Sequence, residues 1–255
     1  MREILEAVAD GELSPAEAES ELRGYARAGA GRFDAAREAR TGVPEAILAD
    51  GKRSDEVASM AAVAVETTGH ALVTRVDDDA VSACRARLAD DHPDAAVTRN
   101  ERARTLVAHG PAYEPPDLDA AVTVVTAGTS DAEAAGEAAV VAEEMGPTVD
   151  VVDDVGVAGI ARVLDRLDAL RDADVLVVAA GREGALPTVV AGLVDVPVIG
   201  LPVSTGYGRG GDGRAALDGM LQSCTALTVV NIDAGFVAGA QAGLVARTVA
   251  AVRES

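Results

Sequence analysis

A glycine-led turn at residues 127–131 (Ala-Gly-Thr-Ser-Asp) has the composition of a phosphate site. Gly128 allows a ligand to approach the backbone closely, while Thr129 and Ser130 supply hydroxyl groups. A helical pattern opens at Asp131, and the free amides and dipole of a helix start attract phosphate. The turn has neither the Gly-Lys-Ser/Thr of a P-loop nor a GxGxxG fingerprint. An ordinary capped helix start fits the same residues, so both interpretations stay open.

Two later turns also combine glycine with polar side chains. In residues 180–187, Gly181 and Gly184 flank an arginine and Glu183. A glutamate at the end of a strand can act as an acid or base or anchor a ligand, and a solvated ion pair is the equal alternative. Residues 202–213 contain five glycines, a composition that fits either a ligand-covering lid or a flexible connection.

Cys224 is the candidate nucleophile of the second half of the chain. A lone cysteine is often a small buried hydrophobe, but its thiolate is a strong nucleophile near a cationic substrate. Cys84 lies in a helical pattern and is interpreted as structural. Because every histidine precedes residue 110, no Ser-His-Asp or Cys-His pair can form within the second half, and metal-ligand spacing is absent. These histidines are His70, His92 and His109. The carboxylates left for proton transfer there are Glu183, Asp131, Asp153, Asp154 and Asp233.

The elements that must position these residues alternate regularly after residue 120. Five short valine-rich runs are apolar at nearly every position, which is typical of strands buried on both faces of a parallel sheet. We therefore predict a doubly wound, flavodoxin-like three-layer α/β domain, in which ligands bind at the carboxyl ends of the strands. The expected strands are residues 121–127, 148–152, 174–180, 196–201 and 226–232, and the expected helices are residues 131–145, 157–171, 185–194, 214–223 and 236–252.

The first part of the chain is less regular and predicts a small α+β domain. Residues 110–117 combine a glycine with three prolines, which interrupt both helices and central strands. We therefore expect an N-terminal domain at residues 1–116 and a C-terminal domain at residues 117–255. The expected N-terminal elements are two short helices within residues 1–27, strands at 45–48, 71–76 and 105–108, and helices at 54–66 and 79–88.

Composition narrows the class of partner. The 255 residues carry 42 acidic and 22 basic side chains, a formal net charge of -20, which repels nucleic acid. An acid-rich chain with a single lysine is typical of a high-salt cytoplasm, so we expect a halophilic archaeal source. Two cysteines make no disulfide scaffold, and no apolar run reaches the length of a membrane span. We predict a cytoplasmic protein without a nucleic-acid or membrane partner.

Several sequence blocks in series resemble the LarB family, whose C-terminal domain has the fold of PurE, the aminoimidazole ribonucleotide carboxylase. In the C-terminal half these blocks are residues 125–131, 154–160, 181–187, 222–224 and 230–236. The N-terminal half matches through Phe33-Asp34, residues 40–45 and Gly51-Lys52. The chain departs from the family's usual residues at Ala161 and Ala234, where polar side chains are more common.

LarB proteins are pyridinium-3,5-biscarboxylic acid mononucleotide synthases of nickel-pincer cofactor biosynthesis. The resemblance implies a dinucleotide substrate, nicotinic acid adenine dinucleotide, and CO₂ or bicarbonate as co-substrate. The pyridinium ring would be carboxylated at C5, and the phosphoanhydride cleaved to release AMP. It further implies that Cys224 is the nucleophile, that Glu183 is an acid or base, and that Asp34 is a further catalytic candidate. The residues expected to hold phosphate or ribose are Gly128, Thr129, Ser130, Asp131, Gly181, Gly184, Lys52 and Arg40.

Two other functions remain open. A PurE-type carboxylase or mutase of purine biosynthesis has a histidine after its second strand, whereas residues 153–162 contain none. A non-catalytic nucleotide-binding module would keep the glycine turns without the chemistry. No cofactor is firmly predicted and no metal ligand is assigned, with Mg²⁺ left open. By family analogy we expect a homo-oligomer, an octamer.

Overall fold

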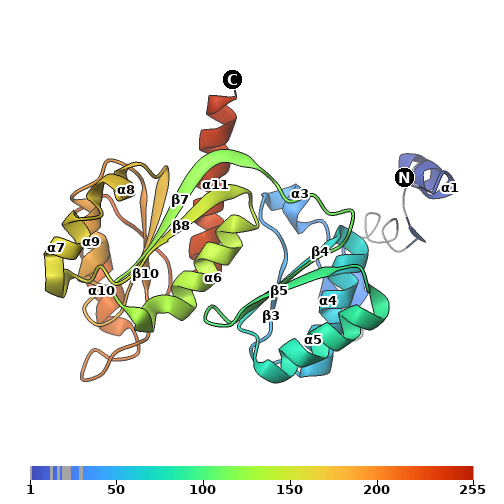
Figure 1. Cartoon of the computed structure of the whole chain (residues 1–255), viewed down its shortest axis with the longest axis horizontal. Coiled ribbons are helices and arrows are strands. Elements are labelled where there is room, and N and C mark those ends of the chain that lie inside the picture. Colours follow the sequence, from blue (N-terminus) through green and yellow to red (C-terminus); the bar gives the residue numbers. More distant parts are fainter. Residues whose placement is uncertain (1, 12–13, 16–17, 19–23, 29–30, 255) are drawn as a thin grey trace. The chain divides into compact units, whose positions relative to one another are not determined.

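The computed structural model describes residues 2–11, 14–15, 18, 24–28 and 31–254. The chain divides into two compact units, Met1–Glu114 and Pro115–Ser255 (Figure 1). Helix α1 (Arg2–Ala9) opens the first unit. Most of the second short helix that we expected before residue 28 lies outside the described residues.

The N-terminal unit is built on a four-stranded mixed sheet of order β3-β4-β6-β5. Strand β3 is parallel to β4, whereas β6 is antiparallel to both of its neighbours. The sequence pattern missed β5, because its side chains are exposed or only half-buried and give no apolar run. The elements are β1 (Ala26–Ala28), β2 (Gly31–Phe33), α3 (Arg37–Thr41), β3 (Ala46–Leu48), α4 (Ser54–Thr68), β4 (His70–Thr74), α5 (Asp78–Asp91), β5 (Ala96–Asn100) and β6 (Thr105–His109).

One hydrophobic core joins the helices of this unit to its sheet. Val57 and Ala61 of α4 pack in one cluster with Ala71 and Val73 of β4, and Phe33 of β2 belongs to it. Small residues on α4 let the helix approach the strands closely. This core is separate from the two cores of the C-terminal unit.

The C-terminal unit is a five-stranded parallel sheet of order β11-β10-β9-β7-β8 with helices on both faces. This confirms the doubly wound α/β fold. The strands are β7 (Leu118–Thr126), β8 (Pro147–Val152), β9 (Val175–Ala180), β10 (Val198–Pro202) and β11 (Thr228–Val229). The helices are η1 (Thr129–Asp131), α6 (Ala132–Glu143), η2 (Val157–Gly159), α7 (Ile160–Leu164), α8 (Leu167–Arg171), α9 (Ala185–Ala191), α10 (Arg214–Leu221) and α11 (Gly235–Arg253).

The position of strand β9 between two layers of helices explains why its sequence is apolar throughout. Val175 and Val177 enter the core shared with α6 and α11, whereas Leu176 and Val178 enter the core shared with α7 to α10. Alternate side chains of a strand point to opposite faces, so a sheet covered by helices on both faces needs both sets to be apolar. The two layers of helices lie on either side of the sheet in Figure 1.

Two elements of this unit differ most from their predicted extent. The helix expected at 157–171 is divided into η2, α7 and α8, and Gly159 has non-helical angles, so that the first α-helix begins only at Ile160. The strand expected at 226–232 is reduced to Thr228–Val229, an edge strand, although the amides of Val230 and Asp233 still donate hydrogen bonds to carbonyl oxygens of β10. Neither change moves the turns that follow the central strands.

Helix α11 also departs from the sequence expectation about membrane spans. Within the described part of the chain it alone is long and apolar enough to cross a membrane, by length and composition. Its small residues Ala238, Ala242 and Ala246 are buried in the core that it shares with α6 and the sheet. Its apolar character is therefore used in packing within this unit.

Candidate functional site

A cavity of about 440 Å³ lies at the carboxyl edge of the parallel sheet. Its walls come from the turns after β7, β8, β9 and β10, where the ligands of doubly wound sheets bind. Gly128, Ser130, Asp131, Gly181 and Glu183 of the predicted site are among the lining residues. The turns that are far apart in the sequence thus meet around one space.

Asp131 is the buried polar centre of this cavity, with 3% of its surface exposed. One carboxylate oxygen accepts a hydrogen bond from the amide of Gly128 (2.9 Å), and the other accepts one from the hydroxyl of Thr205 (3.3 Å). Burial raises the pKa of the Asp131 carboxyl above its ordinary value, while these hydrogen bonds act in the opposite direction. Asp131 therefore fixes the glycine turn from within and ties it to the turn after β10.

Glycine is required where the turn after β9 meets the turn after β10. A Cβ atom at Gly181 would lie 2.3 Å from the carbonyl oxygen of Thr205, far inside contact distance. Gly184, with φ 65°, is the N-cap residue of α9, and a Cβ there would lie 2.5 Å from the carbonyl oxygen of Ala216. We expected both glycines to hold substrate; of the two only Gly181 lines the cavity, and Gly184 serves the packing of α9 and α10.

Two arginines that we did not assign to the site bring guanidinium groups to the cavity, whose lining also includes the carboxyl groups of Asp131 and Glu183. Arg162 and Arg182 both line it, and Arg162 forms an ion pair with Asp154 at 2.7 Å. Glu183 lies beside Arg182 on the same turn and is exposed. An anionic ligand would meet these guanidinium groups in a chain whose overall charge repels it. Arg182 closely follows a predicted strand, a position that could have identified it, whereas Arg162 falls within the helix expected at 157–171.

Cys224 lies away from this cavity within one subunit. The thiol is exposed, but the residue stands four positions before β11, whereas the cavity is built from residues that follow strands. Strands β10 and β11 are parallel, so Cys224 lies at the amino-terminal ends of the strands, whereas the cavity lies at their carboxyl ends. Cys84 is fully buried, and burial raises the pKa of its thiol to about 11.

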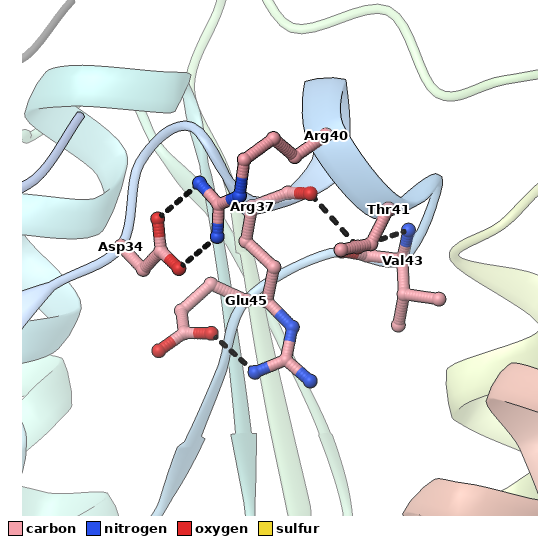
Figure 2. Close-up of polar contacts among 6 residues, drawn as sticks. All are labelled: Asp34, Arg37, Arg40, Thr41, Val43 and Glu45. Carbon is pink, nitrogen blue, oxygen red and sulfur yellow. Dashed lines mark hydrogen bonds and ion pairs between the residues drawn. The ribbon is translucent and has the colours of Figure 1, made fainter.

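The candidates of the N-terminal unit form a separate set of ion pairs, shown in Figure 2. Arg40 donates two hydrogen bonds to Asp34, at 3.1 and 2.7 Å, and this pairing lowers the pKa of the Asp34 carboxyl. Arg37 pairs with Glu45 at 2.8 Å. Lys52 is exposed and donates to the carbonyl oxygen of Leu48. The structure thus pairs Asp34 with Arg40 and does not bring Lys52 to them by a hydrogen bond.

Comparison with known proteins assigns the family. Residues 25–110 match the LarB/PurE-like N-terminal domain, and residues 121–255 match the AIR carboxylase family. This chain is a LarB-like protein of the AIR carboxylase family. An uncharacterized protein of Methanocaldococcus jannaschii is 38% identical to the LarB-like chain over 258 residues, covering 97% of each.

Two solved structures resemble the chain only weakly. A β-glucosidase from Listeria innocua, in complexes with isofagomine and with glucose, aligns with 68% of the LarB-like chain at 16% identity and a TM-score of 0.34. The chain spans 26% of that enzyme's length. The order of the two matched domains indicates a carboxylase-type enzyme, either LarB-like or PurE-like in its reaction.

Proposed function

We propose that this chain is a pyridinium-3,5-biscarboxylic acid mononucleotide synthase. Its substrate would be nicotinic acid adenine dinucleotide, which it carboxylates at C5 of the pyridinium ring and cleaves at the phosphoanhydride to release AMP. The observation that carries this proposal is an exposed thiol, Cys224, in a carboxylase-fold unit that contains no histidine. A reaction that depends on a histidine of this unit does not fit that composition.

A thiolate solves the central chemical problem, because a pyridinium ring is too electron-poor to attack CO₂. Addition of the Cys224 sulfur to C4 forms a C–S bond and converts the ring to a neutral dihydropyridine. The enamine carbon C5 then attacks CO₂, and a base removes the proton from C5. Expulsion of the thiolate restores the aromatic ring, so the carboxylation releases one proton and needs no oxidant. Water completes the separate hydrolysis of the anhydride.

The cavity offers groups for the remaining roles. Glu183 is the carboxylate we assign to removal of the C5 proton. The phosphates would lie against the turn that contains Gly128 and Ser130, with Arg162 and Arg182 neutralising their charge. In the N-terminal unit, we retain Asp34 as a further catalytic candidate and Arg40 and Lys52 as candidate substrate contacts, and loss of substrate affinity in Lys52→Ala would support the Lys52 contact.

Cys224 lies at the amino-terminal ends of the strands, away from the cavity. This mechanism therefore requires a second copy of the chain. If the ring is held in the cavity, the thiol that attacks it belongs to another subunit. Mixing inactive Cys224→Ala subunits with the much slower Glu183→Gln subunits would then raise the activity above that of either variant alone, because some sites combine an intact thiol with an intact carboxylate. Failure of mixed oligomers to regain activity would contradict a shared site.

The phosphate turn is a poor cage for a metal ion, since the Asp131 carboxylate already accepts hydrogen bonds from Gly128 and Thr205. The residues of this turn therefore do not fit a resident Mg²⁺, and no step of the proposed reaction is assigned to a metal ion.

The decisive assay incubates the purified protein with nicotinic acid adenine dinucleotide and ¹³C-bicarbonate, in high salt, and follows products by mass spectrometry. Equal amounts of AMP and a labelled, biscarboxylated mononucleotide would support the synthase. Turnover of aminoimidazole ribonucleotide alone would instead identify a PurE-type carboxylase. Binding of the dinucleotide without turnover would indicate a nucleotide-binding module.

A further inference from the structure

Tyr207 is an exposed aromatic side chain in a chain that has few of them. The sequence contains no tryptophan, two phenylalanines and three tyrosines. Tyr207 is 79% exposed, although an aromatic ring of this kind normally gains stability by burial. It lies on the glycine-rich segment that follows β10. Its position needs a reason other than the packing of its own subunit.

The backbone holds Tyr207 at the rim of the cavity. Thr205, two residues earlier, lines the cavity and donates a hydrogen bond to the buried Asp131 carboxylate. The amide of Arg182 donates to the carbonyl oxygen of Thr205 at 3.4 Å, and Gly181 leaves room for this approach. The first residues of the segment are thus fixed to the cavity wall.

Arg182 orients the ring. Its guanidinium carbon lies 4.4 Å from the centroid of the Tyr207 ring, and one of its nitrogens donates a hydrogen bond to the Tyr207 hydroxyl at 3.0 Å. Arg182 is itself a lining residue of the cavity. The pair therefore presents a flat, oriented surface beside the space in which the phosphates are placed.

We propose that Tyr207, positioned by Arg182, is a stacking platform for the adenine ring of the dinucleotide. This rests on the proposed function and deepens it by naming a specificity residue for the AMP half of the substrate. Stacking of a base on an aromatic side chain needs only two flat surfaces and tolerates an exposed site. The phosphate turn beyond Thr205 would receive the 5′-phosphate of the same nucleotide.

Charge favours the adenine ring over the pyridinium ring at this position. The guanidinium of Arg182 already makes a cation–π contact with the Tyr207 ring. A pyridinium stacked there would bring a second positive charge close to the first, whereas adenine is neutral. The pyridinium ring is then left for the part of the cavity near Glu183.

The test measures binding of AMP, ribose 5-phosphate and nicotinic acid mononucleotide to the full chain by calorimetry. Tyr207→Ala should weaken AMP binding about 5- to 100-fold and leave the other two ligands within about twofold. Tyr207→Phe keeps the ring and should bind AMP within about threefold of the wild type. In Tyr207→Trp the new indole is the sole tryptophan, so AMP should change its fluorescence.

Several results would overturn this assignment. Unchanged AMP binding in Tyr207→Ala, or no AMP binding by the wild type at millimolar concentration, contradicts a stacking site. An equal loss for ribose 5-phosphate means that Tyr207 supports only the shape of the loop. A loss confined to nicotinic acid mononucleotide would mean that Tyr207 stacks on the pyridinium half of the substrate and not on adenine. Because AMP binding needs no turnover, failure of the carboxylation assay alone would leave the adenine site standing.

Discussion

The two units of this chain use their charged side chains differently. In the C-terminal unit the turns after four strands meet at one cavity, and a carboxylate that is 3% exposed, Asp131, lies at its centre. In the N-terminal unit the charged candidates pair with one another near the surface, as Asp34 does with Arg40 and Arg37 with Glu45. Surface pairs of this kind contribute little free energy and leave no buried charge for chemistry. We therefore propose that carboxylation of the ring takes place in the C-terminal unit.

The comparison of the two cysteines should produce the largest effect. Cys224→Ala removes the exposed thiol and should lower carboxylation at least about 1000-fold, since the adduct with the ring cannot form. Cys84→Ala changes only a buried side chain of the N-terminal unit and should keep the rate within about threefold. Product formation by each purified variant measures this, with circular dichroism as a check on folding. Comparable rates in both variants would remove the thiol from the mechanism.

Replacing a glutamate of the cavity and, as a control, a glutamate outside it should give the next largest difference in turnover. Glu183→Gln should slow turnover about 100-fold or more, the usual contribution of a general base, with a smaller change in substrate affinity. Glu66→Gln alters an exposed carboxylate of α4 in the other unit and should leave both parameters unchanged. Steady-state kinetics of the two variants separate kcat from KM. A full rate in Glu183→Gln would exclude it as the base.

Glycine substitutions test the close contact between the turns. Gly181→Ala places a methyl group 2.3 Å from the Thr205 carbonyl oxygen and should cost about 1–3 kcal/mol in free energy of unfolding. Gly31→Ala in β2 meets no atom within 4 Å and should cost much less. Urea unfolding followed by circular dichroism compares them. Equal stabilities would mean that the turn after β10 can withdraw from the cavity wall.

The pH dependence of stability should have opposite signs for the two aspartates. Because the pKa of Asp131 is raised in the folded protein, the folded state keeps a proton that the unfolded chain loses between the unfolded and the folded pKa. The contribution of Asp131 to the free energy of unfolding therefore becomes less favourable as pH rises between these two pKa values. The lowered pKa of Asp34 gives stability that is present above its unfolded pKa and is lost as pH falls through its folded pKa.

Unfolding free energies of wild type, Asp131→Asn and Asp34→Asn between about pH 3 and 6 measure this contrast. The unfolding free energy of wild type minus that of Asp131→Asn should decrease as pH rises. The same difference for Asp34→Asn should increase as pH rises. We expect less than about 1 kcal/mol for Asp34, as for other exposed pairs. The same sign for both variants would contradict the assigned environments.

Prediction from sequence succeeded where the signal is local. The apolar runs around Val124, Val177 and Ile199 became buried central strands, because a strand covered on both faces has a distinct composition. It failed at β5, whose half-exposed residues resemble a loop, and at the divided helix from Val157 to Arg171. In the site, Arg162 and Thr205 were missed because neither residue type is distinctive outside its setting.

The sequence by itself determined the parallel α/β domain, the glycine turns at its strand ends and the LarB-like family. These follow from periodicity, from backbone freedom at glycine and from blocks of residues in fixed order. Only the tertiary structure decided that Asp131 is buried, that Thr205 reaches it across 74 positions, and that Cys224 lies at the other edge of the sheet. The order in which the strands assemble decides which turns become neighbours, and burial then sets their electrostatics.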